Sequence, residues 1–279
     1  MQLSDIRLLV KDFDKCLKFY TEKLGFERLF NTDGFEGFKV SDSDNDDNFV
    51  YLSIFVSDYM AATIGNADKN QPTDCREKMT ISFEVKCVDT TYEALKAKGV
   101  AFINEPTDWE CAGMRVVHLH DPEENLIELR TSPESGKKVS GMKLESVCLL
   151  VKDHKKCVEF YEKLDLKKTY DEGGYASFHV SDNIEGLELL ESDLNAKVVG
   201  NADKKLPIGT EYREKSMISF YAECVDTTYE ALKAKGIEFI NEPFDWTVAH
   251  MRAVHLRDPE GNLVEIHTAL ACEEGRECS

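Results

Sequence analysis

The segment MRVVHLHDPEENLIELRT (residues 114–131) returns as MRAVHLRDPEGNLVEIHT (251–268) in the second half of the same chain. In both copies two strand-like runs flank a short segment of turn-forming residues, D-P-E-E-N in the first and D-P-E-G-N in the second. This pattern predicts a β-hairpin. The chain therefore contains the same hairpin twice.

The duplication extends over nearly all of the 279 residues. LLVKDFDKCLKFYTEKL (8–24) matches LLVKDHKKCVEFYEKL (149–164), and VDTTYEALKAKG occurs unchanged at 88–99 and 225–236. Copies of about 130 residues are domains, because solenoid repeats have shorter periods. We therefore predict a domain over 1–131, a Ser-, Gly- and Lys-rich linker over 132–141, a second domain over 142–270 and a tail over 271–279.

Each copy reads as strand, helix and three strands, and then the same order again. A helix is predicted over 13–24, where apolar residues recur at i, i+3, i+4 and i+7 and Gly25 follows. The second helix is the repeated VDTTYEALKAKG, in which Thr90 and Glu93 match a capping box and Gly99 ends the helix. The strands predicted after it are 100–106, 114–120 and 125–131.

Charge and composition exclude several classes of partner. The net charge is −19, whereas contacts to nucleic acid or an anionic membrane need clustered Lys and Arg. No run approaches the length of an apolar membrane span, and the N-terminus lacks the regions of a signal peptide. We expect a cytoplasmic protein with reduced cysteines, because none of the nine forms a CxxC pattern. The acidity favours positively charged small ligands, although it also serves solubility.

A strand ending in V-K-D, a helix with F-Y-x-x-x-L and the closing D-P-x-x-N-L-I/V-E together resemble the vicinal oxygen chelate superfamily. Its members include glyoxalase I, extradiol dioxygenases, and fosfomycin-resistance and bleomycin-binding proteins. The resemblance implies an α+β fold of tandem paired βαβββ modules, which form half-open, cup-shaped mixed β-sheets with helices outside. It also implies that one fused chain mimics a family homodimer, with further oligomerisation left open. It does not imply one reaction, because this fold hosts many.

The resemblance implies a divalent metal cofactor (Zn, Ni, Fe or Mn), held by four positions of a module pair. A transition metal needs three or four convergent N, O or S ligands, and Ser, Thr and Met are poor ones. The residues at these positions therefore argue against the usual site. In copy one and copy two respectively they are Asp5 and Ser146, Ser53 and Glu188, Thr80 and Met217, and Glu128 and Glu265.

Modules that exchange between the copies would regroup these residues without producing a convincing metal site. The sets would become Asp5, Ser53, Met217 and Glu265, and Ser146, Glu188, Thr80 and Glu128. The sequence leaves pairing within or across the copies open. The best metal candidates lie in the second copy, where His267 shares a strand face with a glutamate two residues earlier. They are Glu188, Glu265 and His267.

The closing glutamates are the best acid–base candidates. Strand side chains alternate in direction, so Glu128 points away from its apolar neighbours and toward the cup that the resemblance implies. His118 and His255 precede the two glutamates by ten residues, and the resemblance places an acid–base residue at that spacing. We predict Glu128, His118, Glu265 and His255 as catalytic candidates. The alternative is that all four are structural residues of the sheets.

Four residues that recur in both copies are candidates for ligand binding. Trp109 and Trp246 offer flat apolar walls, and Arg115 and Arg252 offer clamps for a carboxylate. Core packing and charges at the sheet edge are the alternatives. We expect a small-molecule-binding protein of the glyoxalase/bleomycin resistance type, without the usual metal site, that acts in resistance or sequestration. The alternative is a glyoxalase-like lyase or isomerase, or a dioxygenase-like enzyme, with an atypical site in the second domain.

Overall fold

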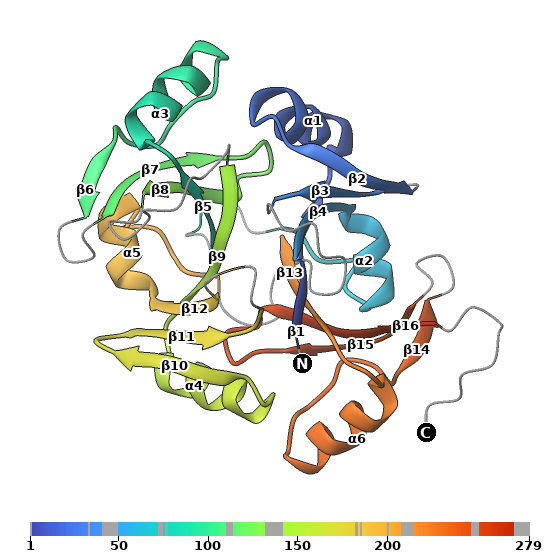
Figure 1. Cartoon of the computed structure of the whole chain (residues 1–279). Helices are drawn as coiled ribbons and strands as arrows, with labels where there is room; N and C mark the ends of the chain where they lie inside the picture. The colour runs from blue at the N-terminus through green and yellow to red at the C-terminus, as the bar shows by residue number, and fades with distance from the viewer. Residues whose placement is uncertain are drawn as a thin grey trace.

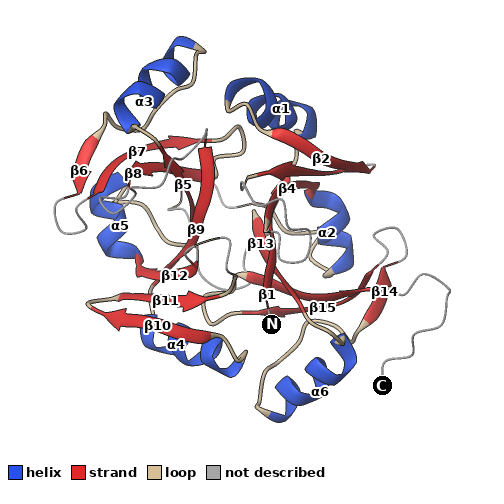
Figure 2. Cartoon of the chain, in the orientation of Figure 1, coloured by secondary structure: helices blue, strands red, loops and turns tan. Residues whose placement is uncertain are grey.

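The computed structural model describes residues 2–32, 34–40, 50–71, 75, 78–109, 114–131, 142–181, 184, 186–199, 201–207, 215–246 and 251–270. Within these ranges two eight-stranded mixed β-sheets are flanked by helices, which confirms the predicted α+β architecture of paired modules (Figures 1 and 2). The predicted linker 132–141 and tail 271–279 lie outside the described residues, so the domain boundaries stay a prediction. No described helix has the length and apolar character needed to cross a membrane.

We call the two sheets sheet I and sheet II. Sheet I has the order β14-β15-β16-β13-β1-β4-β3-β2, and sheet II has the order β10-β11-β12-β9-β5-β8-β7-β6. The strands of sheet I are β1 (Gln2–Val10), β2 (Glu27–Thr32), β3 (Phe35–Lys39), β4 (Tyr51–Val56), β13 (Ser216–Tyr221), β14 (Phe244–Trp246), β15 (Met251–Arg257) and β16 (Leu263–Ala269). Those of sheet II are β5 (Met79–Val85), β6 (Thr107–Trp109), β7 (Met114–His120), β8 (Leu126–Thr131), β9 (Met142–Val151), β10 (Lys167–Glu172), β11 (Tyr175–His179) and β12 (Gly186–Glu191).

Each sheet combines one half of the first repeat with one half of the second. β1 pairs antiparallel with β13, so that Ile6 faces Ile218, and β9 pairs with β5, so that Val147 faces Ile81. Figure 1 shows the same arrangement, with the blue β1 beside the orange β13. The modules are therefore exchanged between the copies, and this decides a point that the sequence left open.

The closing turn holds the two modules of one repeat together. The Tyr20 hydroxyl donates to Asp121 Oδ2 at 2.8 Å, and Glu123 Oε1 accepts from the backbone N–H groups of Lys11 and Asp12 at 3.1 and 2.8 Å. This clamp joins all three sequence motifs on which the family resemblance depends. The second repeat has the same contacts, from Tyr161 to Asp258 and from Lys152 and Asp153 to Glu260.

The predicted helix over 13–24 forms, but its second half is a π-helix. α1 (Phe13–Lys18) continues as η1 (Phe19–Lys23), in which the N–H of Leu24 reaches back five residues to the carbonyl of Phe19. In α4 (His154–Lys163) the matching bond, from Leu164 to Phe160, spans four residues. The first repeat has one residue more at this point, Thr21, and the π turn absorbs it.

The second predicted helix forms in both repeats, as α3 (Val88–Ala97) and α6 (Val225–Ala234). Tyr92 and Leu95 are buried, and Gly99 follows the helix with a φ of 78° that suits glycine. The predicted capping box is wrong, because the helix begins two residues before Thr90. The Thr90 hydroxyl instead donates to the carbonyl of Cys87 at 3.2 Å.

Two further features differ from the sequence-based expectation. Residues 100–106 do not form a strand, because Pro106 lacks an N–H and the Asn104 side chain accepts the N–H of His118 on the neighbouring strand. Only a single bridge, from Phe102 to Leu119, remains before β6. The helices α2 (Ser57–Thr63) and α5 (Ser192–Val199), which follow β4 and β12, were not expected.

Candidate functional site

The central strands separate a core face from a cup face. Ile6 and Leu8 of β1 point into the core that α1 covers, together with Cys16 and Tyr20. Side chains at alternate positions of a strand point to opposite faces, so Asp5, Arg7 and Leu9 point into the cup of sheet I. The matched positions of β9 place Ser146, Cys148 and Leu150 in the cup of sheet II.

An arginine occupies the cup of sheet I. Arg7 is 1% exposed, its Nε donates to Asp5 Oδ2 at 2.8 Å, and its Nη2 lies 3.4 Å from Glu265 Oε1. Its guanidinium carbon lies 4.8 Å from the ring centre of Phe35 and 5.8 Å from that of Phe55. Burial opposes the charge, but the two carboxylates outweigh this effect and hold the pKa of Arg7 above its ordinary value.

Among the described residues, apolar side chains pack against one another in the rest of this cup. They are Leu9, Phe55, Met60, Ile64, Met217 and Leu263, with Phe35, Ile240 and Trp246 packed against them. The ring of Trp246 lies 5.6 Å from that of Phe55, nearly perpendicular to it. Met60 and Ile64 come from α2, which therefore covers the cup face of sheet I.

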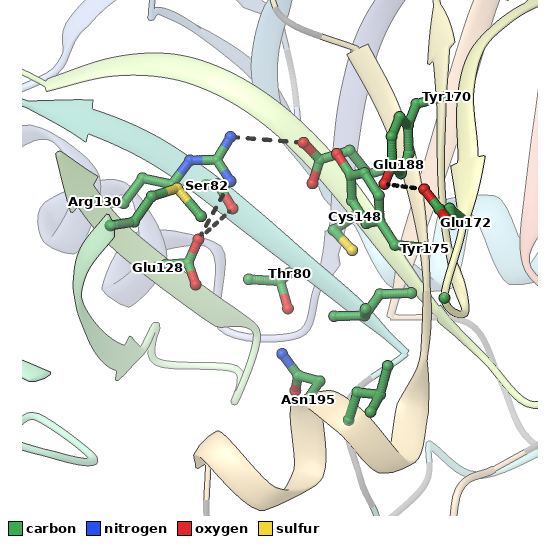
Figure 3. Close-up of a pocket in the computed structure, with 14 residues that line it drawn as sticks. Thr80, Ser82, Glu128, Arg130, Cys148, Tyr170, Glu172, Tyr175, Glu188 and Asn195 are labelled. Atoms are coloured by element: carbon green, nitrogen blue, oxygen red, sulfur yellow. Dashed lines mark hydrogen bonds and ion pairs between the residues drawn. The ribbon is translucent and has the colours of Figure 1, made fainter. Parts of the chain in front are cut away.

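Sheet II instead has a cavity of about 520 Å³ on its cup face (Figure 3). Strands β5, β7, β8, β9, β10, β11 and β12 and helix α5 form its wall. The lining residues are Thr80, Ser82, Met114, Glu128, Arg130, Cys148, Tyr170, Glu172, Gly173, Tyr175, Glu188, Leu190, Leu194 and Asn195. This volume falls in the range that suits a small organic ligand.

Smaller residues at matched positions explain why sheet II has a cavity where sheet I is filled. At four places the repeat alignment sets a large side chain in the cup of sheet I against a smaller one that lines the cavity. The pairs are Arg7 and Cys148, Phe55 and Leu190, Met60 and Asn195, and Met217 and Thr80.

The cation of sheet II comes from a different strand. Arg130 of β8 binds Glu145 through its Nε, and its terminal nitrogens lie 3.7 Å from Glu128 Oε1 and 3.6 Å from Glu188 Oε1. Figure 3 shows Arg130 pointing between these last two carboxylates. Burial raises the pKa of Glu188 despite the opposing effect of Arg130. The cavity therefore combines one guanidinium with an excess of carboxylates.

Each cup contains a buried histidine–glutamate pair. The backbone N–H of His118 donates to Asn104 Oδ1 at 2.8 Å, and His118 Nδ1 lies 3.2 Å from the same oxygen. His118 Nε2 lies 3.1 Å from Glu128 Oε2, within hydrogen-bond distance. Burial would raise the pKa of Glu128, but the bond from His118 and the charges nearby lower it below its ordinary value. In sheet I, Asn241, His255 and Glu265 repeat this arrangement.

The pairs His118–Glu128 and His255–Glu265, predicted from their spacing, are each brought together. Glu128 also lines the cavity, with its histidine behind it. Their catalytic role stays a prediction.

The three best metal candidates are not brought together. Glu188 lies in sheet II, whereas Glu265 and His267 lie in sheet I, because the modules exchange between the repeats. His267 Nε2 lies 2.8 Å from Ser4 Oγ; the Ser4 hydroxyl donates to the carbonyl of Ser219 and so accepts from the histidine. Burial lowers the pKa of His267.

Of the predicted ligand-binding residues whose side chains the structure describes, Arg115, Arg252 and Trp246 do not line the cavity. Arg115 forms ion pairs with Asp89 at 2.6 Å and Asp108 at 2.8 Å, and Arg252 is paired in the same way with Asp226 and Asp245. Trp246 belongs to the filled cup of sheet I. The side chain of Trp109 lies outside the described part of the structure. A ligand-binding role for these residues stays a prediction.

The carboxylates at the positions that the family resemblance assigns to metal ligands face guanidinium groups. Asp5 and Glu265 in sheet I face the guanidinium of Arg7, and Glu128 and Glu188 in sheet II face that of Arg130. Among the residues that the structure describes, no group of three or more His, Cys, Asp or Glu side chains could hold a metal ion. The donors of either cup do not fit a divalent transition metal, which needs three or four convergent ligands.

Several residues of the cups were not predicted from the sequence. Arg7 supplies the cation of sheet I, and Cys148, Tyr175 and Asn195 shape the cavity. A signal was present for Arg7. It lies two residues from Asp5 in a mostly apolar strand, which places two opposite charges on one strand face.

Comparisons with known proteins agree with this geometry. Residues 2–129 and 143–266 match the family model of the Glyoxalase/Bleomycin resistance protein/Dioxygenase superfamily. The "Uncharacterized protein YraH" of Bacillus subtilis (strain 168) is 40% identical over 133 residues, which are 46% of this chain and 100% of that protein.

Solved structures share the fold over nearly the whole chain. Glyoxalase I from Zea mays superposes with a TM-score of 0.65 at 19% identity, over 95% of this chain and 92% of the maize chain. A putative dioxygenase from Bacillus subtilis subsp. subtilis str. 168 superposes with a TM-score of 0.61 at 16% identity, over 96% and 85% of the two chains. The family match covers both repeats, and the chain therefore belongs to the Glyoxalase/Bleomycin resistance protein/Dioxygenase superfamily.

Proposed function

We propose that this chain binds a small organic molecule in the cavity of sheet II and acts by sequestering it, as in resistance, without a metal ion. The observation that carries the proposal is the cavity of about 520 Å³ at a place where the matched cup is filled. Ligand pockets combine apolar walls with a few polar groups at defined positions. We also propose a cytoplasmic location, and a fused chain that performs the role of a homodimer.

The wall of the cavity favours a ligand that is partly apolar and positively charged. Tyr170 and Tyr175 form an aromatic side, with ring centres 5.8 Å apart. Glu172 and Glu188 supply negative charge, and Arg130 is already paired with Glu145. Aromatic faces attract cations, and this attraction grows when water is excluded.

The test is to fill the cavity with the residues of the matched cup. A thermal-shift screen of organic cations, anions and neutral aromatics first identifies a ligand. At 100 times its Kd a ligand stabilises by about 2.7 kcal/mol, which raises the Tm by roughly 5 to 10 °C. In the double variant Thr80→Met/Leu190→Phe, which carries the residues found at Met217 and Phe55, this shift should disappear.

A matched control makes the same two changes at exposed positions. The variant Thr32→Met/Leu29→Phe alters β2 of sheet I, away from the cavity, and should retain the full shift. Urea unfolding of both variants shows whether they are folded. An undiminished ligand shift in a folded, filled variant would refute binding in the cavity, and so would the absence of any ligand across the screen.

A second candidate function is favoured by one observation. Glu128 lines the cavity and is hydrogen-bonded to His118, which is an arrangement that supports proton transfer in a glyoxalase-like isomerase or lyase. Metal analysis of untagged protein, followed by turnover assays with Glu128→Gln, separates the two functions. Catalytic turnover that this variant loses while it still binds the ligand would favour the enzyme over the sequestering protein.

A further inference from the structure

The filled cup of sheet I shows how this fold accommodates a guanidinium group. The guanidinium of Arg7 lies over the ring of Phe35 and between the carboxylates of Asp5 and Glu265. It is almost completely buried, although burial of an unpaired charge is costly. The cup compensates the cost through two carboxylates and an aromatic face.

Sheet II keeps counterparts of these surroundings but lacks the arginine. The repeat alignment places Tyr175 where sheet I has Phe35, and Glu128 where it has Glu265. Both line the cavity. Cys148 stands at the position of Arg7, and its side chain ends at the sulfur atom. The space that an arginine would occupy from this strand therefore belongs to the cavity.

The charges of sheet II are not balanced as those of sheet I are. In sheet I, Arg7 contacts two carboxylates, those of Asp5 and Glu265, and Glu265 is also hydrogen-bonded to His255. In sheet II, Arg130 contacts the carboxylates of Glu145 and Glu128, and Glu128 is also hydrogen-bonded to His118. Glu188 then remains as a further carboxylate in the wall, where the matched residue of sheet I is the neutral Ser53.

The hydrogen-bond partners of Glu188 are neutral groups. They are the hydroxyls of Tyr175 and Ser146. The nearest Arg130 nitrogen, at 3.6 Å, is farther than the 2.7–3.2 Å of an ordinary N–H···O bond. A cation that entered the cavity would therefore meet a buried carboxylate whose charge Arg130 compensates only in part.

We propose that the ligand of the sheet II cavity carries a planar guanidinium or amidinium group, which lies on Tyr175, pairs with Glu188 and takes the place that Arg7 takes in sheet I. This inference rests on the proposed function and adds the chemical class of the ligand. A planar cation can donate two parallel hydrogen bonds to a carboxylate while its face stacks on an aromatic ring. An ammonium group of equal charge cannot stack in this way, and a neutral amide leaves the carboxylate uncompensated.

Three probes of similar size separate these cases. Benzamidine is a planar cation, benzylamine is a cation with a tetrahedral head group, and benzamide is neutral but has the shape of benzamidine. Isothermal titration at pH 7.5 should show that benzamidine binds at least tenfold more tightly than either of the others. Equal or tighter binding of benzylamine or benzamide would overturn the inference and leave the proposed function standing, because a ligand would still bind in the cavity.

Two variants transfer the residues of sheet I into sheet II. Cys148→Arg supplies the guanidinium from the protein itself, and Glu188→Ser supplies the residue found at Ser53. Each should weaken benzamidine binding at least tenfold. Matched controls make the same changes of charge outside the cavity: Cys87→Arg at the start of α3, and Glu93→Ser on its exposed face, should both bind benzamidine as the unmodified chain does.

The outcomes of this experiment are distinct. Unchanged affinity for benzamidine in a folded Cys148→Arg or Glu188→Ser variant would overturn the inference, and so would a complete lack of benzamidine binding. Neither result refutes the proposed function if another ligand from the wider screen binds the unmodified chain and no longer binds the filled variant Thr80→Met/Leu190→Phe. If the filled variant is folded and still binds the ligands of the wider screen, the proposed function itself is refuted.

Discussion

Replacing Arg7 with methionine removes the only cation that contacts Asp5 among the described contacts of sheet I. The change keeps an apolar chain of similar length on Phe35 and Phe55, so packing changes little. It leaves the buried carboxylate of Asp5 with the Ser53 hydroxyl as its remaining partner, at 2.8 and 3.0 Å. Breaking a buried ion pair by removal of one partner typically costs 3–5 kcal/mol. We expect the free energy of unfolding to fall by about 3–5 kcal/mol and the Tm by roughly 6–20 °C.

The loss of unfolding free energy should depend on pH, and the ionisation of Asp5 sets the direction of this dependence. Burial raises the pKa of Asp5 from its ordinary value of 3.8 to about 6, although Arg7 lowers it. A carboxyl whose folded pKa is raised contributes stability below its unfolded pKa and loses it as the pH rises through the folded value. Without Arg7 the folded pKa rises further, so the variant loses more above pH 6. The difference from the unmodified chain should therefore shrink between pH 8 and pH 4.

Glu265 also makes the stability difference between the Arg7→Met variant and the unmodified chain larger at neutral pH than at low pH. Burial opposes its charge, but Arg7 and the bond from His255 outweigh burial and hold its pKa below the ordinary value of 4.5. This depressed pKa contributes stability above the unfolded pKa, which is lost as the pH falls. Removal of Arg7 reduces that contribution most at neutral pH. Both carboxylates thus predict the largest destabilisation between pH 7 and 8.

Urea unfolding at pH 4, 6 and 8 measures the effect, and two further variants control it. Cys148→Met places the same side chain at the matched position of sheet II, where no ion pair is lost, and should cost less than about 1.5 kcal/mol. Combining Arg7→Met with Asp5→Asn should recover more than half of the loss, because the asparagine is neutral. A loss below about 1 kcal/mol at pH 8, or one of equal size at pH 4, would refute the role assigned to Arg7.

Three further outcomes are expected. Deletion of Thr21 should convert the π turn to an α-helix and leave the Tm within about 3 °C by calorimetry, since the second repeat lacks this residue; a larger fall would show that the π turn is needed. Tyr161→Phe should lower the free energy of unfolding in urea by about 1–3 kcal/mol, because buried Asp258 loses a donor at 3.0 Å; no change would argue against this clamp. A backbone hydrogen bond at the start of the helix lowers the pKa of Cys87, whereas burial raises the pKa of Cys16. Iodoacetamide at pH 8 should therefore modify Cys87 before Cys16. Peptide mass spectrometry gives the order of modification, and the reverse order would contradict the prediction.

Much of the local structure could be predicted because its causes are local. Apolar spacing identified the first helix, and Gly99 marked the end of the second. Turn chemistry identified the hairpin that ends each repeat. The strand expected over 100–106 was wrong because Asn104 bonds to a residue of a strand that follows it by fourteen positions. Such a contact leaves no periodic signal in the segment itself.

The candidate site was predictable only in part. The family resemblance pointed to the spacing of His118 and Glu128, and the register of the hairpin places the two residues opposite each other. The grouping of Glu188 with Glu265 and His267 failed to form, because it depends on which module of one repeat pairs with which module of the other. The cavity depends on the summed volumes of side chains from seven strands and a helix, and no single strand carries that information.

The sequence by itself determined the duplicated module and the clamp that closes it. Residues of the V-K-D strand end, the F-Y helix and the D-P-E turn meet through Tyr20, Asp121 and Glu123, so the motifs that mark the family are the contacts that hold a repeat together. Only the tertiary structure decided that the sheets form across the repeats, because both copies present nearly the same strand edges to each other. It also decided that one cup is filled by Arg7 while the other, with Cys148 in its place, remains open. The physical reason is that packing depends on volume and charge at facing positions, which lie far apart along the chain.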